Sequence, residues 1–396
     1  MLAKGDEMTF GGTRTVAGAI MGTAVVFLLS LVSVAGLRAE APAKAGQAGP
    51  PQGAQMSETA FKNVEVLKGI PADEFMDVMG MFAASLGFDC VACHSPDIKS
   101  DRAAFAIETP LIRRARQMIA MMNGINETSF GGRPRVTCFT CHHGGNAPES
   151  EPNLALQYGD VIDDPNSMRI ATDARFTADQ VFDKYVQALG GAQRLAGLTS
   201  YAARGTYEGF NTSGNSAPIE IVAKAPNQRA ELVRTLEGNS VKIYDGRTAW
   251  ASEDWRPLPL MAFTGGNLEG ARIDAMTSFP ATIRQGFSRW QVGTTTIADR
   301  PVQVLQGTNA GQTPVNFYFD ASGLLVRVVR WNKTPVGNVP TQMDYSDYRD
   351  VAGAKMPFRI VVTWTNGQNT IVLSDVQPNI VIDAARFARP APYQRR

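Results

Sequence analysis

All four cysteines of this 396-residue chain, and two of its three histidines, belong to two copies of one short pattern. The first copy is CVACH at residues 90–94, and the second is CFTCH at residues 138–142. Each copy places two thiols at positions i and i+3 and an imidazole directly after the second thiol. A chain with so few cysteines and histidines would almost never contain this pattern twice by chance, so the two copies indicate one shared chemistry.

That chemistry is the covalent attachment of haem. Two thiols at this spacing can add to the two vinyl groups of the macrocycle, and the adjacent histidine then ligates the iron. A zinc site would not need a histidine after both pairs, a thioredoxin-like pair would need a βαβ setting, and a disulfide at this spacing closes too small a loop to stabilise much. We therefore expect two covalently bound c-type haems. Their attachment and proximal residues are predicted to be Cys90, Cys93 and His94 for one haem, and Cys138, Cys141 and His142 for the other.

Methionine is the expected sixth ligand of both irons. His143 is the one histidine left, and it follows a proximal ligand too closely to reach across either haem. A methionine closes the coordination sphere and raises the potential, whereas an open site would permit peroxide or oxygen chemistry. The electron-carrier hypothesis therefore depends on suitably placed methionines.

A helix is predicted over residues 71–86, just before the first motif. Pro71 suits the first helical position, acidic residues occupy the first turn, and a glycine follows the last one. Apolar side chains repeat at helical spacing along this segment. This spacing places Met79 on the buried stripe and leaves Met76 and Met81 partly off it.

A second helix is predicted over residues 111–127, directly after Pro110. Its apolar face carries Met118 and Met122, whereas Met121 falls on another face. The periodicity favours Met118 or Met122 as the residue that faces a haem, and it does not choose between these two.

The segment from about residue 61 to residue 145 resembles the cytochrome c subunit of photosynthetic reaction centres. In that family each haem segment is a helix with the axial methionine, a turn and then CxxCH. One such segment is similar to FKNVEVLKGIPADEFMDVMGMFAASLGFDCVACH, and another to ARQMIAMMNGINETSFGGRPRVTCFTCHHGG. The resemblance implies Met79, which precedes Cys90 by eleven residues, as one distal ligand. It implies Met118 as the other, once a two-residue shortening of the loop is allowed.

The family's subunit typically carries four haems, one of them with a histidine as sixth ligand. This chain can attach two, and it has no histidine in the corresponding segment, residues 127–130. The resemblance thus implies a two-haem relative that passes electrons to or from a reaction centre or another membrane complex. Redox proteins of such a complex are the implied partners.

The N-terminal residues predict export. Residues 16–37 form an uncharged, strongly apolar run that is long for a cleaved signal and long enough to span a bilayer. We interpret residues 1–38 as a signal peptide or membrane anchor helix, and residues 39–56, rich in Ala, Pro and Gly, as a flexible linker. The remaining chain is then expected on the periplasmic side of the bacterial inner membrane. A dihaem domain over residues 57–150 and a connector over residues 151–176 are predicted to follow.

Residues 177–390 are predicted to form an antiparallel β domain. A capping box of Thr177 and Gln180 opens one helix, and a polar helical stretch is expected around residues 268–287. Turn sequences join three pairs of strands into hairpins. The predicted pairs are 241–244 with 248–251, 315–319 with 324–329, and 358–365 with 370–376. The expected fold class is α+β, with a mainly helical N-terminal cytochrome domain followed by a half-barrel-like antiparallel sheet with a few helices.

The layout of this second part, together with the segments YDGRTAW and DYSDYRDV, is similar to the LolA/LolB-like lipoprotein carriers. The resemblance implies a sheet that can hold an acyl chain in its concavity. A packed structural or docking domain is the alternative interpretation.

Composition and charge narrow the function further. A net charge of +1 argues against a nucleic-acid partner, and no histidine or cysteine follows His143 to build a hydrolase triad. Residues 56–175 hold 11 basic and 16 acidic side chains, so the first domain is predicted to attract a basic redox partner or to dock against the basic second domain. The leading hypothesis is an electron carrier and not an enzyme. The alternatives are a dihaem peroxidase and a lipophilic-ligand carrier with a haem sensor domain.

Overall fold

The computed structural model describes residues 54–148, 150–152, 154, 167–236, 238–253 and 256–392. All of them belong to one compact unit. The segment predicted as a signal peptide or membrane anchor, and nearly all of the predicted linker, lie outside the described residues. Within the described ranges, no helix is both long and apolar enough to cross a membrane.

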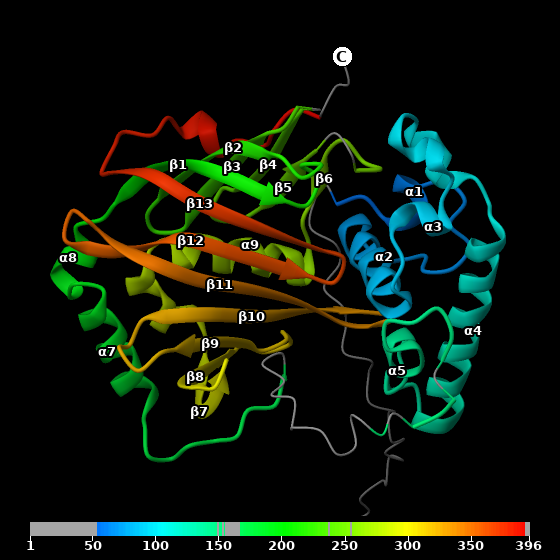
Figure 1. Ribbon diagram of the computed structural model, residues 1–396, viewed down its shortest axis with the longest axis horizontal. Coiled ribbons are helices and arrows are strands. Elements are labelled where there is room, and N and C mark those ends of the chain that lie inside the picture. Colours follow the sequence, from blue (N-terminus) through cyan, green and yellow to red (C-terminus); the bar gives the residue numbers. More distant parts are fainter. Residues whose placement is uncertain are drawn as a thin grey trace, which may run out of the picture. The chain divides into compact units, whose positions relative to one another are not determined.

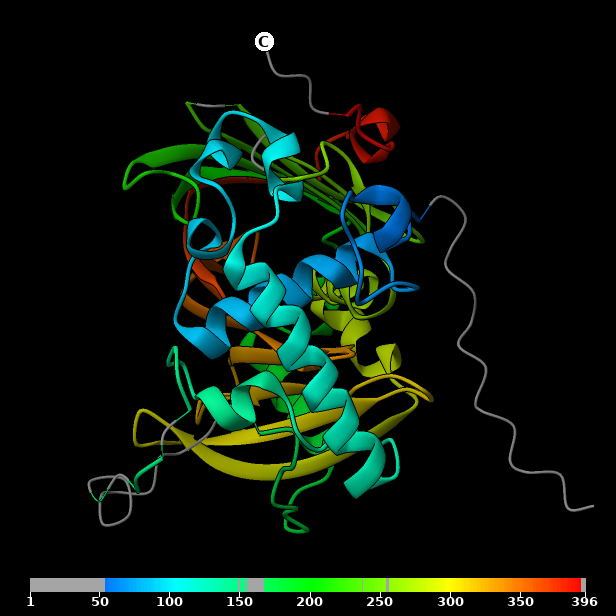
Figure 2. The same ribbon diagram turned by 90° about the vertical axis from the view of Figure 1, so that its right-hand side faces the viewer.

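Residues 57–142 form a helical part with two long helices and several single turns (Figure 1). Its elements are α1 (Ser57–Ala60), α2 (Ala72–Leu86), α3 (Cys90–Cys93), the 3-10 turns η1 (Pro96–Lys99) and η2 (Arg102–Ala106), α4 (Pro110–Phe130) and α5 (Cys138–His142). The two long helices, α2 and α4, cross each other in the view of Figure 2. Helix α2 therefore leads into the first CxxCH motif, and α4 precedes the second.

The ends of both long helices follow from local chemistry. Pro71 is the N-cap of α2 and not its first residue, so the helix begins one position later than predicted. Its end is set by Gly87, whose φ of 68° is left-handed and suits glycine. Helix α4 is longer than predicted at both ends. The Thr109 side chain caps it by accepting from the Ile112 N–H at 3.2 Å, and Gly131, with a φ of 58°, ends it.

The second part is a single antiparallel sheet with thirteen strands among the described residues. Its strands are β1 (Ser200–Gly209), β2 (Ser216–Lys224), β3 (Gln228–Arg234), β4 (Asn239–Tyr244), β5 (Ala249–Ser252), β6 (Met261–Ala262), β7 (Arg289–Ile297), β8 (Arg300–Thr308), β9 (Val315–Phe319), β10 (Leu325–Thr334), β11 (Gly337–Val351), β12 (Ala354–Trp364) and β13 (Gly367–Pro378). Consecutive strands pair from β1 to β6 and from β7 to β13, and β1 joins the two series by pairing with β13. Strands β6 and β7 are the two edges of the sheet. The three predicted hairpins are present as β4–β5, β9–β10 and β12–β13.

Short helices accompany the sheet. They are α7 (Ala178–Ala188), α8 (Ala192–Ala196), α9 (Gly265–Thr277) and the 3-10 segments η3 (Pro280–Gly286) and η4 (Ala384–Phe387). The predicted capping box of α7 is confirmed, because the side chains of Thr177 and Gln180 each accept from the other residue's backbone N–H. The single helical stretch predicted around residues 268–287 is two segments, since Pro280 cannot continue α9 and instead starts η3. The predicted α+β class, with a large antiparallel sheet in the C-terminal part, is confirmed.

The main core lies between α7, α9 and one face of the sheet, which we call the inner face. Phe182 and Tyr185 of α7 and Ile273 of α9 are buried there with Phe317 and Phe319 of β9. The rings of Tyr185 and Phe319 meet edge to face with centroids 5.0 Å apart. A second buried cluster joins β1, β2, β12 and β13. The sheet part therefore closes its own core with its own side chains.

Candidate haem sites

The first CxxCH motif forms one helical turn. The Asp89 side chain caps α3 by accepting from the Ala92 N–H at 3.1 Å, and the His94 N–H donates to the Cys90 carbonyl at 2.9 Å. Cys90 is exposed, Cys93 is half-buried, and both thiols are free. The turn therefore brings the two thiols and the imidazole together as a haem attachment site requires.

The ring of His94 is held by groups that the sequence did not reveal. Its Nδ1 lies 3.1 Å from the carbonyl oxygen of Phe105, and the Phe105 ring meets the imidazole edge to face at 5.2 Å. Burial lowers the pKa of His94, so the neutral imidazole is favoured. When Nδ1 donates its hydrogen to a carbonyl, the Nε2 lone pair is free to ligate a metal. No motif or spacing in the sequence marks Phe105 for this role.

The second motif repeats the arrangement. Thr137 and Thr140 form a capping box at the start of α5, and His142 Nδ1 lies 3.1 Å from the Gly145 carbonyl oxygen. His143 follows in a left-handed conformation, is exposed, and has its ring 5.6 Å from that of Phe139. Both motif histidines thus have the hydrogen-bond support that metal-ligating histidines typically have.

A cavity of about 730 Å³ adjoins the first motif. Cys90, Cys93 and His94 line it together with Met79, which is half-buried on α2. The structure therefore brings the predicted distal methionine to the same cavity as the predicted proximal histidine. Apolar side chains also line the cavity, among them those of Phe82, Phe105 and Ile112. A cavity with thiols, an imidazole, a thioether and apolar walls fits a covalently attached haem.

Helix α2 also packs against the second motif, and Met79 and Phe82 border this contact as well as the cavity. Val78 and Met81 of α2 lie in one apolar cluster with Met122 of α4 and with Cys138. Met81, predicted to lie partly off the buried stripe, is 6% exposed. The reason is tertiary: the β10–β11 turn covers it, and a Cβ on Gly337 would lie 3.1 Å from the Met81 methyl carbon.

The two methionines that periodicity could not separate differ in burial. Met122 is 4% exposed and lies in the cluster with Cys138, whereas Met118 is half-buried on α4 and outside that cluster. The assignment of Met118 as distal ligand stays a prediction, and Met122 is its direct competitor.

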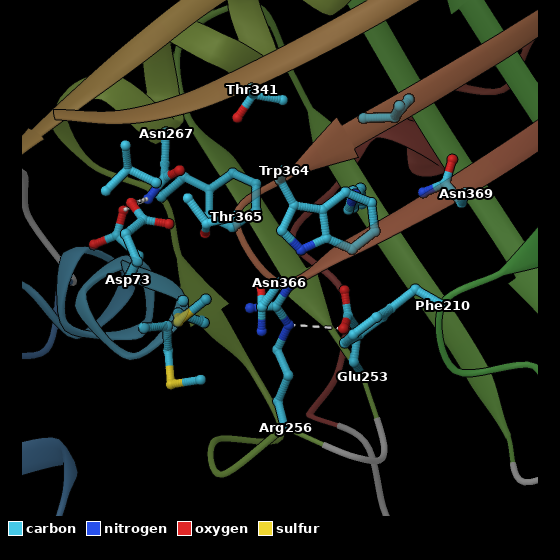
Figure 3. A pocket seen from close by; sticks show the side chains of 18 of the residues that line it. Asp73, Phe210, Glu253, Arg256, Asn267, Thr341, Trp364, Thr365, Asn366 and Asn369 are labelled. Atoms are coloured by element: carbon cyan, nitrogen blue, oxygen red, sulfur yellow. Dashed lines mark hydrogen bonds and ion pairs between the residues drawn. The ribbon is translucent and has the colours of Figure 1, made fainter. Parts of the chain in front are cut away.

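Two carboxylates of α2 bind the sheet part. Asp73 accepts from the Thr264 N–H at 2.6 Å, from the Thr264 hydroxyl at 2.9 Å and from Asn267 Nδ2 at 3.3 Å. Asp77 accepts from Asn267 Nδ2 at 2.8 Å and from the amide of Asn332 on β10. Figure 3 shows Asp73 and Asn267 side by side. We call this set of contacts the carboxylate clamp. The sequence indicated only that acidic residues occupy the first turn of this helix.

Burial dominates the electrostatics of the clamp. It raises the pKa of Asp73, and the hydrogen bonds from Thr264 and Asn267 oppose that shift. The neighbouring Glu74 has its pKa raised to about 7, first by burial and then by the nearby charges of Asp73 and Asp77. The clamp therefore fixes the helix that carries Met79, at the cost of burying carboxylates.

The two CxxC pairs do not converge on one metal. Across the described ranges, no group of three or more His, Cys, Asp or Glu side chains is placed to hold a metal ion among themselves.

Comparison with known families supports the cytochrome interpretation. The model of the photosynthetic reaction centre cytochrome C subunit family matches residues 21–155, which is less than half of the chain. The resemblance predicted from residues 61–145 is thus confirmed, and the match extends beyond both of its ends. It implies haem binding by this part of the chain. No curated protein is significantly similar to the chain.

Several solved structures are similar to more than half of the chain. A LolA superfamily protein of Nitrosomonas europaea is 12% identical, with a TM-score of 0.36, over 54% of this chain and 98% of its own. A DUF1329 family protein of Desulfovibrio piger is 12% identical, with a TM-score of 0.37, over 53% of this chain and 96% of its own. An outer membrane lipoprotein-sorting protein domain of Vibrio parahaemolyticus is 10% identical, with a TM-score of 0.35, over 53% and 97%. These structures include proteins of the kind that the predicted LolA/LolB-like resemblance named. Their similarity to this chain is one of fold alone.

Proposed function

We propose that this protein is a dihaem c-type cytochrome that carries electrons to or from a membrane redox complex on the periplasmic side of the inner membrane. One observation carries the proposal: both CxxCH histidines have Nδ1 within 3.1 Å of a backbone carbonyl oxygen, and the first shares its cavity with Met79. The family match supports the same class of protein.

Each predicted residue has a defined task. The four cysteines hold the two macrocycles, the carbonyl oxygens of Phe105 and Gly145 orient His94 and His142, and Met79 and Met118 are the proposed distal ligands. When bound, haem supplies a reversible one-electron change at iron. The apolar wall residues exclude water, and the carboxylate clamp keeps α2 in place. The chain thus tunes and positions its cofactors and makes or breaks no substrate bond.

Haem quantification combined with a redox titration tests the proposal. We expect two haems per chain after purification from a host that matures c-type cytochromes, both low-spin and reversibly reduced. Colourless protein, or a high-spin iron that reacts with peroxide, would contradict the electron-carrier function.

Methionine variants test the distal ligands. Met79→Ala should abolish one methionine-ligated spectrum and lower one midpoint potential, because the strong-field thioether is lost. Met121, on α4, is 50% exposed, so Met121→Ala is the matched control. It should change neither the spectrum nor the midpoint potential of either haem. For the second haem, loss of the signal in Met118→Ala supports the proposed ligand. If the methionine-ligated signal of the second haem is lost in Met122→Ala and kept in Met118→Ala, Met122 is the distal ligand instead.

The proposed redox partner is a basic protein, attracted by the acidic excess of the first part. The structure moderates this expectation, because Asp73 and Asp77 bind the sheet part and Glu65 and Glu108 both pair with Arg116, at 2.7 and 2.8 Å. We therefore expect association rates with a basic donor cytochrome to fall modestly as ionic strength rises. A rate that does not change with salt would contradict the steering proposal.

A further inference from the structure

The cavity at the first motif does not end at the helical part. It continues along the inner face of the sheet, where Val362 of β12 and Ile371 and Leu373 of β13 line it. Figure 3 shows side chains from both parts around this space, including Asp73, Thr341, Trp364 and Asn369. One continuous cavity therefore adjoins both the first haem site and the interior of the sheet part.

The sheet end of the cavity contains half-buried charged groups. Arg229 of β3 donates to the hydroxyls of Tyr201 at 3.3 Å and Ser278 at 3.2 Å, and it pairs with Glu231 at 3.4 Å. Arg330 of β10 lies over the backbone of α9, so close that a Cβ on Gly270 would be 2.3 Å from its guanidinium carbon. Glycine at this position makes room for the guanidinium.

Two neighbouring groups there lack hydrogen-bond partners among the described residues. They are Oδ1 of Asp274 on α9 and Nε of Arg330, both fully buried atoms of residues that line the cavity. Arg330 is close enough to act on the Asp274 carboxylate, whose pKa is raised by burial and lowered in part by this cation. A third buried atom, Oδ1 of Asn369 on β13, is also unpartnered. Folded proteins rarely leave such groups unsatisfied, so they indicate a ligand that both donates and accepts hydrogen bonds.

The charges indicate that this ligand is neutral. The two half-buried cations, Arg229 and Arg330, are balanced by the carboxylates of Glu231 and Asp274, and Lys242, the third cation that acts on Asp274, is exposed to solvent. A fatty-acid carboxylate or a phosphate would add an uncompensated negative charge beside Asp274 and could not donate to it. A hydroxyl on an apolar molecule meets both needs, because it donates to Asp274 and accepts from Arg330.

We propose that the inner-face cavity binds a lipophilic quinol, with one ring hydroxyl between Asp274 and Arg330 and its apolar tail along β12 and β13. A quinol is favoured over other lipophilic alcohols because the same cavity adjoins the first haem site, so this choice rests on the proposed cytochrome function. The quinone form binds more weakly, because it has no hydroxyl to donate to Asp274.

Binding of decylubiquinol to the haem-loaded full chain, measured anaerobically by native mass spectrometry, tests the proposal. We expect one molecule per chain, with an affinity about tenfold or more above that of decylubiquinone and of oleate. Tighter binding of oleate, or the absence of a one-to-one complex, would overturn it. The haem content of the same samples is read separately, so a failure of the cytochrome function is distinguishable from a failure of quinol binding.

A blocking variant locates the site. Thr341→Phe on β11 projects into the cavity and should weaken quinol binding by about tenfold or more. Thr363→Phe is the matched control: it precedes Trp364, which lines the cavity, so its side chain lies on the other face of β12. The control should bind as the parent protein does. Equal binding by both variants and the parent would place the ligand elsewhere.

A second variant tests the head-group contact without filling the cavity. Asp274→Asn keeps the size of the side chain but gives it an amide that can donate to a quinone oxygen. It should remove most of the preference for quinol over quinone while the haem spectrum stays unchanged. An unaltered preference would exclude Asp274 from the site.

Discussion

The helical part and the sheet part stabilise themselves in different ways. In the sheet part, large side chains such as Phe317 and Phe319 are completely buried against one another and against α7 and α9. In the helical part, Met79, Phe82 and Ile112 line a cavity, and Phe130 at the end of α4 is 41% exposed. The comparison teaches that protein atoms alone fill the aromatic core between β9, α7 and α9, whereas the long helices border a cavity that fits the proposed haem.

Removing both haems should produce the largest difference between the two parts. In the variant Cys90→Ser, Cys93→Ser, Cys138→Ser and Cys141→Ser, amides of α2 and α4 should lose protection from hydrogen exchange by about a hundredfold or more. Amides of β8, β9 and β10 should exchange as in the parent protein. Hydrogen exchange measured by mass spectrometry reads both parts in one sample. Equal loss of protection in both would show that their stabilities are not separable.

A core substitution should affect the sheet strongly. Phe317→Ala removes a ring that is completely buried, and we expect the free energy of unfolding to fall by about 3–5 kcal/mol. Phe130→Ala is the matched control in the helical part and should cost less than about 1 kcal/mol, since its ring is partly in solvent. Urea unfolding followed by tryptophan fluorescence gives both values. Similar losses in the two variants would contradict the contrast between the cores.

The carboxylate clamp joins the two parts, and its loss should have an intermediate effect. Asp73→Ala leaves the Thr264 N–H and hydroxyl without their acceptor, so we expect a loss of about 1–3 kcal/mol in the free energy of unfolding. Glu127→Ala, an exposed carboxylate on α4, is the control and should change little. If Asp73→Ala were neutral, the clamp would not couple the helices to the sheet.

The smallest expected effect is a pH dependence at Glu74. Its pKa is higher in the folded state, about 7, than the usual 4.5, so the folded chain retains this proton more firmly than the unfolded chain does. The protonated Glu74 therefore stabilises the fold fully below about pH 4.5. This stabilisation is lost as the pH rises to about 7, and none of it is left above that range. Glu74→Gln should flatten this slope in urea unfolding measured at several pH values. An unchanged slope would show that Glu74 is not the titrating group.

Local sequence signals predicted the hairpins well and the longer strands less well. Turn sequences such as Asp245-Gly246 mark hairpins because few residues tolerate the required backbone angles, and those hairpins are present. The fifteen-residue strand β11 was not predicted. The left-handed Asp347, which the pairing with β12 skips, interrupts the alternation, and the place of the strand between β10 and β12 sustains it.

The features of the haem sites also differ in how well the sequence predicts them. The CxxCH spacing predicts the attachment residues by itself, because thioether chemistry depends on positions within one helical turn. The burial of Met81, by contrast, comes from Val336 and Gly337, more than 250 positions along the chain. No periodicity within α2 contains that information.

The sequence alone predicted the haem-attachment residues, and it determined the class of fold and the hairpin turns, since each depends on residues close together in the chain. Tertiary structure alone decided which methionines are buried and that one cavity reaches from the first motif into the sheet. These features depend on contacts between distant segments, and such contacts form when the two parts pack together.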